Sequence, residues 1–349
     1  MSMSDRVPPR QILKYYVYVA TAWGGFHLPI DVLLFRSRGL SFGEIGIVAA
    51  VGGAVTLVME IPSGYVADRI GRRNSLLLSS GLMTAGATVF ALAGAFRAFA
   101  LAQATFVLGI AFRSGTADAW LYDTLADSDR TEEFARVSGR GQTALLVVLG
   151  VTSVAGGYLG EIDFGLAYLA TAGTTAISFL TVSTFDEPPR TDDDDRVTLV
   201  TVRTTLRTEL ARPELRAVVA GLALFFGVVT TINAVLIQPA SVAAGVSVGQ
   251  LGWLFGSFTA AGAAISYVSG WVKENVGLKR TLVAAPFVVA AALGVGGVAV
   301  VAIVPGFVAM RAVQRLVSPL AGQYINDRLS SVGRAGTECR RRRTPSLRR

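Results

Sequence analysis

Five of the charged side chains that stand in or next to largely apolar stretches of this sequence are candidates for chemistry. They are Asp31, Glu60, Arg113, Asp118 and Asp123. A carboxylate in a low-dielectric environment can bind and release a proton near neutral pH, because burial disfavours its charged form. A guanidinium keeps its proton, so it needs a counter-charge, water or backbone carbonyls beside it. We therefore interpret the five residues as candidates for substrate binding or ion coupling.

Arg113 is the strongest of these candidates. It lies about ten residues from the cytoplasmic end of its apolar stretch, and therefore roughly 15 Å deep in a helix that rises 1.5 Å per residue. Asp118 follows five residues later and would point about 140° away on the same helix, so it is a poor partner. We expect Arg113 to face a partner on another helix or a polar cavity.

Two of the carboxylates also have structural explanations. Asp31 lies only about one helical turn from Phe35, so it could lie at the edge of the membrane, exposed to water. Glu60 lies about two turns from a basic loop. We expect Glu60 to pair with a loop arginine such as Arg69 or Arg72 rather than to couple ions.

Uncharged polar residues and further basic residues in the apolar stretches could line a substrate cavity. His27, the only histidine, is either a buried group hydrogen-bonded by neighbouring helices, which we favour, or a proton-transfer group. The other candidates belong to the second half of the chain: Asn233, Gln238, Arg311, Gln314 and Arg315.

The elements that hold these residues are predicted to be membrane-spanning helices. Of the 349 residues, 52% are hydrophobic and 16% are charged, and the mean hydropathy is +0.53. These values are unlike those of a soluble globular protein. Stretches of about 20 to 25 residues with few or no charges can cross a hydrocarbon core of roughly 30 Å as helices. Ten are predicted: 12–34, 43–66, 74–96, 99–121, 139–160, 164–184, 215–238, 249–272, 280–304 and 306–327.

The basic residues predict how these helices are oriented. With a cytoplasmic N-terminus, 26 of the 32 lysines and arginines fall on the cytoplasmic side of the membrane and three on the other side. This asymmetry is the positive-inside rule, so we expect a multi-pass plasma-membrane protein with both termini in the cytoplasm. The net charge of +8 therefore reflects orientation and does not indicate a nucleic-acid partner.

Enzyme and cofactor motifs are missing from the sequence. Cys339 is the only cysteine, which excludes disulfides within the chain and zinc-finger spacing. There is no HExxH motif, no GxxxxGK[ST] phosphate loop and no second histidine that could build a metal site. We expect a protein that is not an enzyme and that uses no cofactor apart from a coupling proton.

One loop segment occurs twice. GYVADRIGRR, beginning at Gly64, returns 206 residues later as GWVKENVGLKR, beginning at Gly270. Upstream of the first copy, Ser41 and Glu44 form a capping-box pattern. Its serine recurs at the same offset, as Ser247. Matching residues at one offset predict two homologous halves. The predicted cytoplasmic gating motif consists of Gly64, Asp68, Arg69, Gly71, Arg72 and Arg73, with Gly270, Glu274, Gly277 and Lys279 in the second copy.

A polar segment separates the two halves. It contains two adjacent prolines and four consecutive aspartates, which indicate a solvated linker. Leucines and valines at helical spacing, from Leu199 to Leu210, predict a short amphipathic helix lying on the membrane. The predicted domains are a six-helix bundle (1–185), the linker (186–214), a four-helix bundle (215–330) and an Arg-rich cytoplasmic tail (331–349).

The loop from Gly64 to Arg73 resembles the GxxxDRxGRR signature of the major facilitator superfamily, and the copy from Gly270 resembles its degenerate repeat. The resemblance extends over roughly residues 12 to 330. It implies an all-α membrane protein with the general-substrate-transporter fold, built from two pseudo-symmetric helical bundles, here of six and four helices.

By this resemblance the protein would be a secondary active transporter that moves a small organic molecule across a lipid bilayer by alternating access. Its cavity would be lined mainly by helices one, four, seven and ten, and we expect a proton to be the coupling ion. Arg113 followed by Gly115 is loosely similar to a motif of the drug-efflux branch. Efflux is therefore the first expectation and solute uptake the second, although the proline of that branch's fifth-helix motif is missing before Gly156 and Gly157.

The end of the chain departs from the family pattern. Family members usually have twelve spans, and ten are predicted here. The sequence from Gly333 onward is rich in arginine and has no apolar stretch, which predicts a truncated or frameshifted reading frame. A truncated membrane protein that does not transport is therefore the alternative to a transporter, and the oligomeric state is not predicted.

Overall fold

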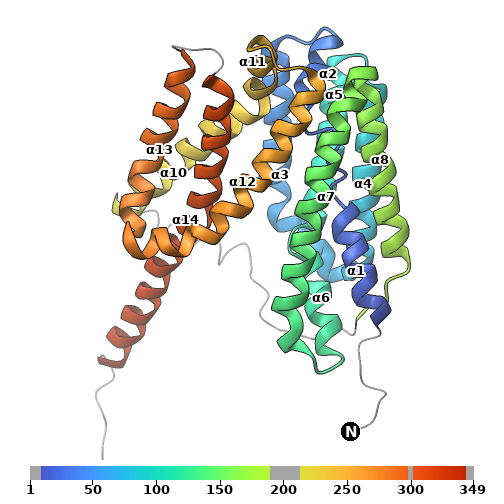
Figure 1. Ribbon diagram of the computed structural model, residues 1–349. Helices are drawn as coiled ribbons and strands as arrows, with labels where there is room; N and C mark the ends of the chain where they lie inside the picture. Colours follow the sequence, from blue (N-terminus) through green and yellow to red (C-terminus); the bar gives the residue numbers. More distant parts are fainter. Residues whose placement is uncertain (1–8, 189–212, 298–301, 343–349) are drawn as a thin grey trace, which may run out of the picture. The chain divides into compact units, whose positions relative to one another are not determined.

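The computed structural model describes residues 9–188, 213–297 and 302–342, and within these ranges it contains helices and turns but no strand (Figure 1). The predicted all-α class is confirmed. The helices of the first half are α1 (Pro9–Thr21), α2 (Asp31–Ser37), α3 (Phe42–Ile70), α4 (Arg72–Leu92), α5 (Phe96–Arg113), α6 (Thr116–Ala126), the 3-10 turn η1 (Thr131–Glu133), α7 (Phe134–Ile162) and α8 (Phe164–Ser183). Those of the second half are α10 (Pro213–Thr231), the π-helical turn η2 (Ile232–Leu236), α11 (Ile237–Ala243), α12 (Val248–Asn275), α13 (Leu278–Gly294), the 3-10 turn η3 (Val295–Gly297) and α14 (Ile303–Arg342).

Six helical stretches in the described part of the chain are long and apolar enough to cross a membrane, with mean hydropathies between 1.3 and 2.1. Many of their apolar side chains point outward; Leu57 and Val58 of α3, for example, are 81% and 66% exposed. Outward-facing apolar side chains suit a helix whose solvent is lipid. A seventh stretch qualifies only if Val268–Asn275 and Leu278–Gly294 form one span, and these two segments are bent by 110°. The count of ten spans stays a prediction.

Four of the predicted spans are not continuous α-helices in the described structure, which corrects the helices expected over 12–34, 99–121, 215–238 and 280–304. The first is interrupted between α1 and α2, where Gly24 and Gly25 have φ of 68° and 82°. The fourth is interrupted between α5 and α6, where Gly115 has φ of 73°. The seventh contains the π-helical turn η2. In the ninth span α13 ends at Gly294 and the 3-10 turn η3 follows. Glycine reaches positive φ at little cost, and interrupted helices and π turns are frequent at functional sites.

Contacts divide the chain into two compact units. The first contains the described residues up to 188 together with Thr231–Thr259, and the second contains 213–230 and the residues from Ala260 onward. In the first unit α4 packs against α5 and α8, and α1 packs against α7 and α8. In the second unit α13 and α14 lie side by side (Figure 1).

Matching local structures occur at the two copies of the repeat. Ser41 caps α3 in a reciprocal capping box with Glu44, and 206 residues later Ser247 and Gln250 exchange the same two hydrogen bonds. Gly71 has φ and ψ of 95° and 156°, and the equivalent Gly277 has 87° and 145°. Equal backbone geometry at equivalent positions supports the predicted duplication.

The predicted amphipathic helix of the linker lies outside the described residues. The predicted domain boundaries stay predictions. The helix α14 continues to Arg342, beyond the start of the predicted tail at 331.

Candidate functional site

The segment between α1 and α2 holds His27 against α8. The imidazole Nδ1 lies 3.1 Å from Oγ1 of Thr171, and the ring centroid lies 5.5 Å from that of Phe106 and 5.3 Å from that of Tyr168. The side chain is buried. A buried histidine with a hydrogen-bond partner agrees with the interpretation of His27 as a group satisfied by neighbouring helices. Its predicted place in a substrate cavity stays a prediction.

Asp31 is the first residue of α2 and has a specific partner on α8. The hydroxyl of Tyr168 donates a hydrogen bond to Oδ1 of Asp31, with an O–O distance of 2.8 Å. Tyr168 is buried. A carboxylate exposed to water at the membrane edge would need no such partner, so Asp31 is better described as part of the contact between the interrupted first span and α8. Sequence reasoning missed Tyr168 because nothing in its own helix marks it.

Gln238 of α11 caps the start of α2. Its Oε1 accepts hydrogen bonds from the backbone N–H of Val32 at 2.7 Å and of Leu33 at 3.4 Å, and its Nε2 donates to the carbonyl of Leu28 at 2.9 Å. The side chain is 2% exposed. The first N–H groups of a helix have no acceptor within the helix, and Gln238 provides one. The structure thus places this predicted cavity residue in a buried contact that uses both polar atoms of its amide.

A close contact between α7 and the first part of α12 belongs to the same unit. A Cβ atom added at Gly157 would lie 2.8 Å from the carbonyl oxygen of Gly249, and one added at Gly252 would lie 2.7 Å from that of Ser153. The carboxylate of Glu161 also accepts the N–H of Gly249 at 2.9 Å. Small residues permit such close approach of helices. The start of α12 therefore packs backbone to backbone on α7.

Arg113 is the last residue of α5, two positions before the interruption at Gly115. Its guanidinium carbon lies 5.3 Å from the ring centroid of Trp23 and 5.9 Å from that of Tyr18, within the range of cation–π attraction. In the described part of the chain no carboxylate lies within 4.0 Å of it, and Asp118 is exposed. The predicted partner on another helix is present, and it is aromatic rather than acidic.

The signature loop forms an ion-pair network in the first unit. Nη1 of Arg72 lies 2.7 Å from Oδ1 of Asp68, and Nε of Arg72 lies 3.6 Å from Oδ2 of Asp123 at the end of the fourth predicted span. Asp123 thus connects that span to the loop between α3 and α4. The two carboxylates share one guanidinium.

The next residue of the motif connects the loop to the end of α8. The backbone N–H of Arg73 donates to Oε2 of Glu187 at 3.0 Å, and its Nη2 donates to the carbonyl of Ser183 at 2.5 Å. A Cβ atom added at Gly71 would lie 2.5 Å from Oε1 of Glu187. Nothing in the sequence distinguishes Glu187, because it lies among the other acidic residues of the predicted linker.

The predicted pairing of Glu60 with a loop arginine such as Arg69 or Arg72 is wrong for the described residues. Glu60 is exposed and forms no ion pair with any described residue, while Arg72 pairs with Asp68 and Asp123. The guanidinium carbon of Arg69 lies 4.6 Å from the ring centroid of Tyr65. Arg72 follows Asp68 by one helical turn, the spacing at which side chains meet, whereas it lies beyond the end of α3 and far along the chain from Glu60. Asp68 is therefore the better-placed partner for Arg72.

The second copy of the motif keeps the backbone but not the ion pairs. Glu274 and Lys279 are both exposed, and neither pairs with an oppositely charged side chain in the described ranges. A Cβ atom added at Gly270, or at Gly64 in the first copy, would meet nothing within 4 Å.

The remaining candidates lie in the second half of the chain. Nη1 of Arg311 donates to Oε1 of Gln314 at 3.1 Å. The side chain of Arg315 is exposed and passes close to Gly262 of α12, whose added Cβ would lie 3.5 Å from its Cγ. Asn233 is half-buried in η2.

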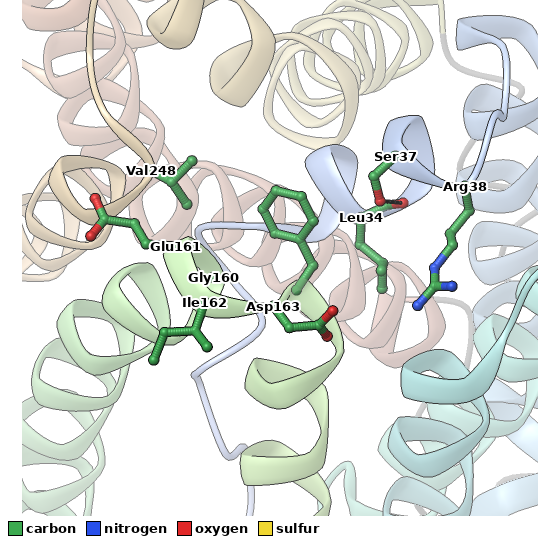
Figure 2. A pocket seen from close by; sticks show the side chains of 9 residues that line it. Leu34, Ser37, Arg38, Gly160, Glu161, Ile162, Asp163 and Val248 are labelled. Carbon is green, nitrogen blue, oxygen red and sulfur yellow. Dashed lines mark hydrogen bonds between the residues drawn. The ribbon is translucent and has the colours of Figure 1, made fainter.

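A pocket of about 540 Å³ opens where α2, the α7–α8 turn and the start of α12 meet (Figure 2). Figure 2 shows Glu161 near Val248 at one side of it and Arg38 at the other. Glu161 and Asp163 are already used as hydrogen-bond acceptors for Gly249 and Gly165. The described residues contain no group of three or more His, Cys, Asp or Glu side chains that could hold a metal ion.

Comparison with known proteins gives one matching family model, described as Major Facilitator Superfamily, over residues 15–335. An uncharacterized MFS-type transporter, YxaM, of Bacillus subtilis (strain 168) is 27% identical over 165 residues. That match takes in 47% of this chain and 40% of the relative's length.

Solved structures of transporters share the fold. The nucleoside transporter NupG superposes with a TM-score of 0.75 at 11% identity, covering 92% of this chain and 82% of that one. A bacterial homolog of the human lysosomal transporter Spinster, in an inward-facing and unoccupied conformation, gives 0.65 at 18% identity, covering 95% and 80%. A D-xylose-proton symporter gives 0.63 at 10% identity, covering 88% and 81%.

Proposed function

Since the chain belongs to the Major Facilitator Superfamily and shares the fold of solved transporters, we propose that it is a membrane transporter that exports a small organic molecule in exchange for protons, by alternating access. The family and the fold support transport across a membrane, which is part of the proposal. The direction, the coupling ion and the substrate are its other parts.

The bond between Tyr168 and Asp31 is the observation that supports proton coupling most directly. It holds a carboxylate at the interruption of the first span, between two helices, with an O–O distance of 2.8 Å. A protonated Asp31 would lose its negative charge and change the strength of this bond, because charged acceptors form stronger hydrogen bonds than neutral ones. Proton binding at Asp31 would therefore alter how α2 packs on α8.

Alternating access needs a region whose packing can change, and α2 is part of one. Gln238 joins α11 to the same short helix, one residue from Asp31, and α12 packs on α7 nearby through glycines. By the predicted topology these contacts lie on the extracellular side. A change at Asp31 would thus act on the contacts that close that side. Efflux is supported by the loose similarity of Arg113 and Gly115 to the drug-efflux motif.

The test is transport into and out of proteoliposomes that contain a pH-sensitive dye. A panel of small organic molecules is applied with an imposed pH gradient, and proton movement and solute movement are followed together. We expect Asp31→Asn to reduce substrate-dependent proton movement about tenfold or more, while exchange of labelled for unlabelled substrate continues without a gradient. Asp127→Asn is the matched control, because Asp127 is exposed and its carboxylate has no hydrogen-bond partner in the described chain.

Two results would contradict this function. Proton movement in Asp31→Asn equal to that in Asp127→Asn would remove Asp31 from the coupling mechanism. If neither the unmodified protein nor a variant moved any solute, the chain would not be an active transporter.

A further inference from the structure

The membrane interior of this protein holds a cation without a matching acid. Arg113 is permanently charged, and in the described structure aromatic rings lie within cation–π range of its guanidinium, while no carboxylate lies within 4.0 Å of it. Two nearby acids have other partners: Asp31 is bonded to Tyr168, and Asp123 pairs with Arg72. Asp118 is exposed and lies close enough to Tyr15 and Tyr18 to act on them electrostatically, but it is not within 4.0 Å of the guanidinium.

The second half of the chain contributes no acid to the membrane interior. Its predicted spans contain neither Asp nor Glu, except for Asp327, the last residue of the last span. The same spans contain four basic residues, Arg216 and Arg280 at span ends and Arg311 and Arg315 farther in. Water or an anionic ligand can balance the charge of the half-buried Arg113, because an unpaired charge in a low dielectric is costly.

The surface around Arg113 is apolar and aromatic. Trp23 is half-buried beside the guanidinium, and Ala117 and Tyr16 are partly buried against the same core cluster. The hydroxyl of Tyr18 is buried, and its charged neighbours are Arg113 and Asp118. A ligand that suits these neighbours has an apolar body and a group that accepts hydrogen bonds.

We propose that the transported solute is an aromatic organic anion whose carboxylate pairs with Arg113 and whose ring lies against Trp23. Arginine suits this role, because its planar fork of N–H donors matches the two oxygens of a carboxylate. The partly exposed Trp23 offers an apolar face beside the charge. This proposal rests on the proposed transport function and adds the chemical class of its substrate.

Three naphthalene compounds with nearly the same apolar body test the charge preference: 1-naphthoate, 1-naphthylmethanol and 1-naphthylmethylammonium. Their binding to the purified, detergent-solubilised protein is measured by equilibrium dialysis at millimolar concentrations and below. We expect the carboxylate to bind about tenfold or more tightly than the other two, and Arg113→Gln to remove that preference. Arg113→Lys should restore part of it, because the charge returns without the two-pronged geometry.

Arg97→Gln is the matched control, because Arg97 is an exposed arginine on the same helix α5 and forms no ion pair in the described structure. The proposal is overturned if the cation or the alcohol binds as tightly as the carboxylate, if none of the three binds, or if Arg113→Gln changes binding no more than Arg97→Gln.

Binding in detergent and exchange in proteoliposomes separate this proposal from the transport function. Binding of naphthoate that depends on Arg113, without exchange of labelled naphthoate, would support the anion site and contradict transport. Proton-coupled exchange of the ammonium compound would support transport and contradict the anion site.

Discussion

Replacing Gln238 should loosen the contact between α11 and α2. Gln238→Leu keeps the side chain close to its original size but removes the acceptor for Val32 N–H and the donor for the Leu28 carbonyl, which lie 2.7 and 2.9 Å away. Because the side chain is 2% exposed, water cannot readily replace these bonds while the contact is closed. The backbone groups can be satisfied only by opening it.

The size of the effect follows from these two bonds. Leaving a buried polar group without its partner costs about 1–3 kcal/mol, while hydrogen bonds between membrane helices average roughly 0.6 kcal/mol. Losing both hydrogen bonds should therefore destabilise the closed contact by about 1–3 kcal/mol. At 1.4 kcal/mol per factor of ten, the open form should become about 5 to 150 times more populated.

Cysteine labelling can measure this population, because the chain has one cysteine to remove. In a Cys339→Ser background, Ser241→Cys places a thiol on α11 at a site that is 0% exposed. We expect Gln238→Leu to raise its labelling rate with a membrane-impermeant reagent by about 5 to 150 times. Gln142→Leu, at an exposed glutamine of α7, should leave the rate unchanged. An equal rate in Gln238→Leu, with thermal unfolding showing both variants folded, would refute the reasoning.

Two further predictions concern glycines, and thermal unfolding of the purified protein checks both. Gly71→Ala should lose about 1–3 kcal/mol of stability, because φ is 95° and the new Cβ would lie 2.5 Å from Glu187, whereas Gly64→Ala should change little because nothing lies within 4 Å. Gly252→Ala should also lose about 1–3 kcal/mol, since the new Cβ would lie 2.7 Å from a backbone oxygen of α7, whereas Gly256→Ala meets its nearest atom at 3.5 Å and should cost less. Equal losses within either pair would contradict the geometry.

Hydropathy predicts where this chain forms helices, but it does not predict where they are interrupted. The apolar stretch 12–34 reads as one span, although it contains the pair Gly24 and Gly25 at the interruption. Glycine is a weak signal here, because the chain contains 38 glycines and several of them, such as Gly86 and Gly157, permit close helix packing instead. The equivalent region of the seventh span, 206 residues later, includes η2, although its sequence has no glycine pair.

The charged residues show what the sequence can predict about their contacts and what it cannot. The sequence predicts that Arg113 needs one, because its charge and depth follow from residue type and helical rise. It does not predict that Trp23 and Tyr18 provide it, because that depends on how the helices are rotated against each other. The pairing expected for Glu60 failed for a related reason: it ignored Asp68, which lies one turn from Arg72 on the adjoining helix and competes for the same guanidinium.

The two copies of the signature show what a duplicated sequence preserves. Gly71 and Gly277 keep the same backbone conformation, because a positive φ before a helix is a local requirement that glycine alone meets cheaply. The ion pair is not preserved: Asp68 becomes Glu274, but the position of Arg72 becomes Leu278, so the base one turn away is gone. The position equivalent to Asp123 is also a leucine. Local backbone geometry therefore persists in both halves, while the charge network, which needs partners from several helices at once, is found only in the first copy within the described residues.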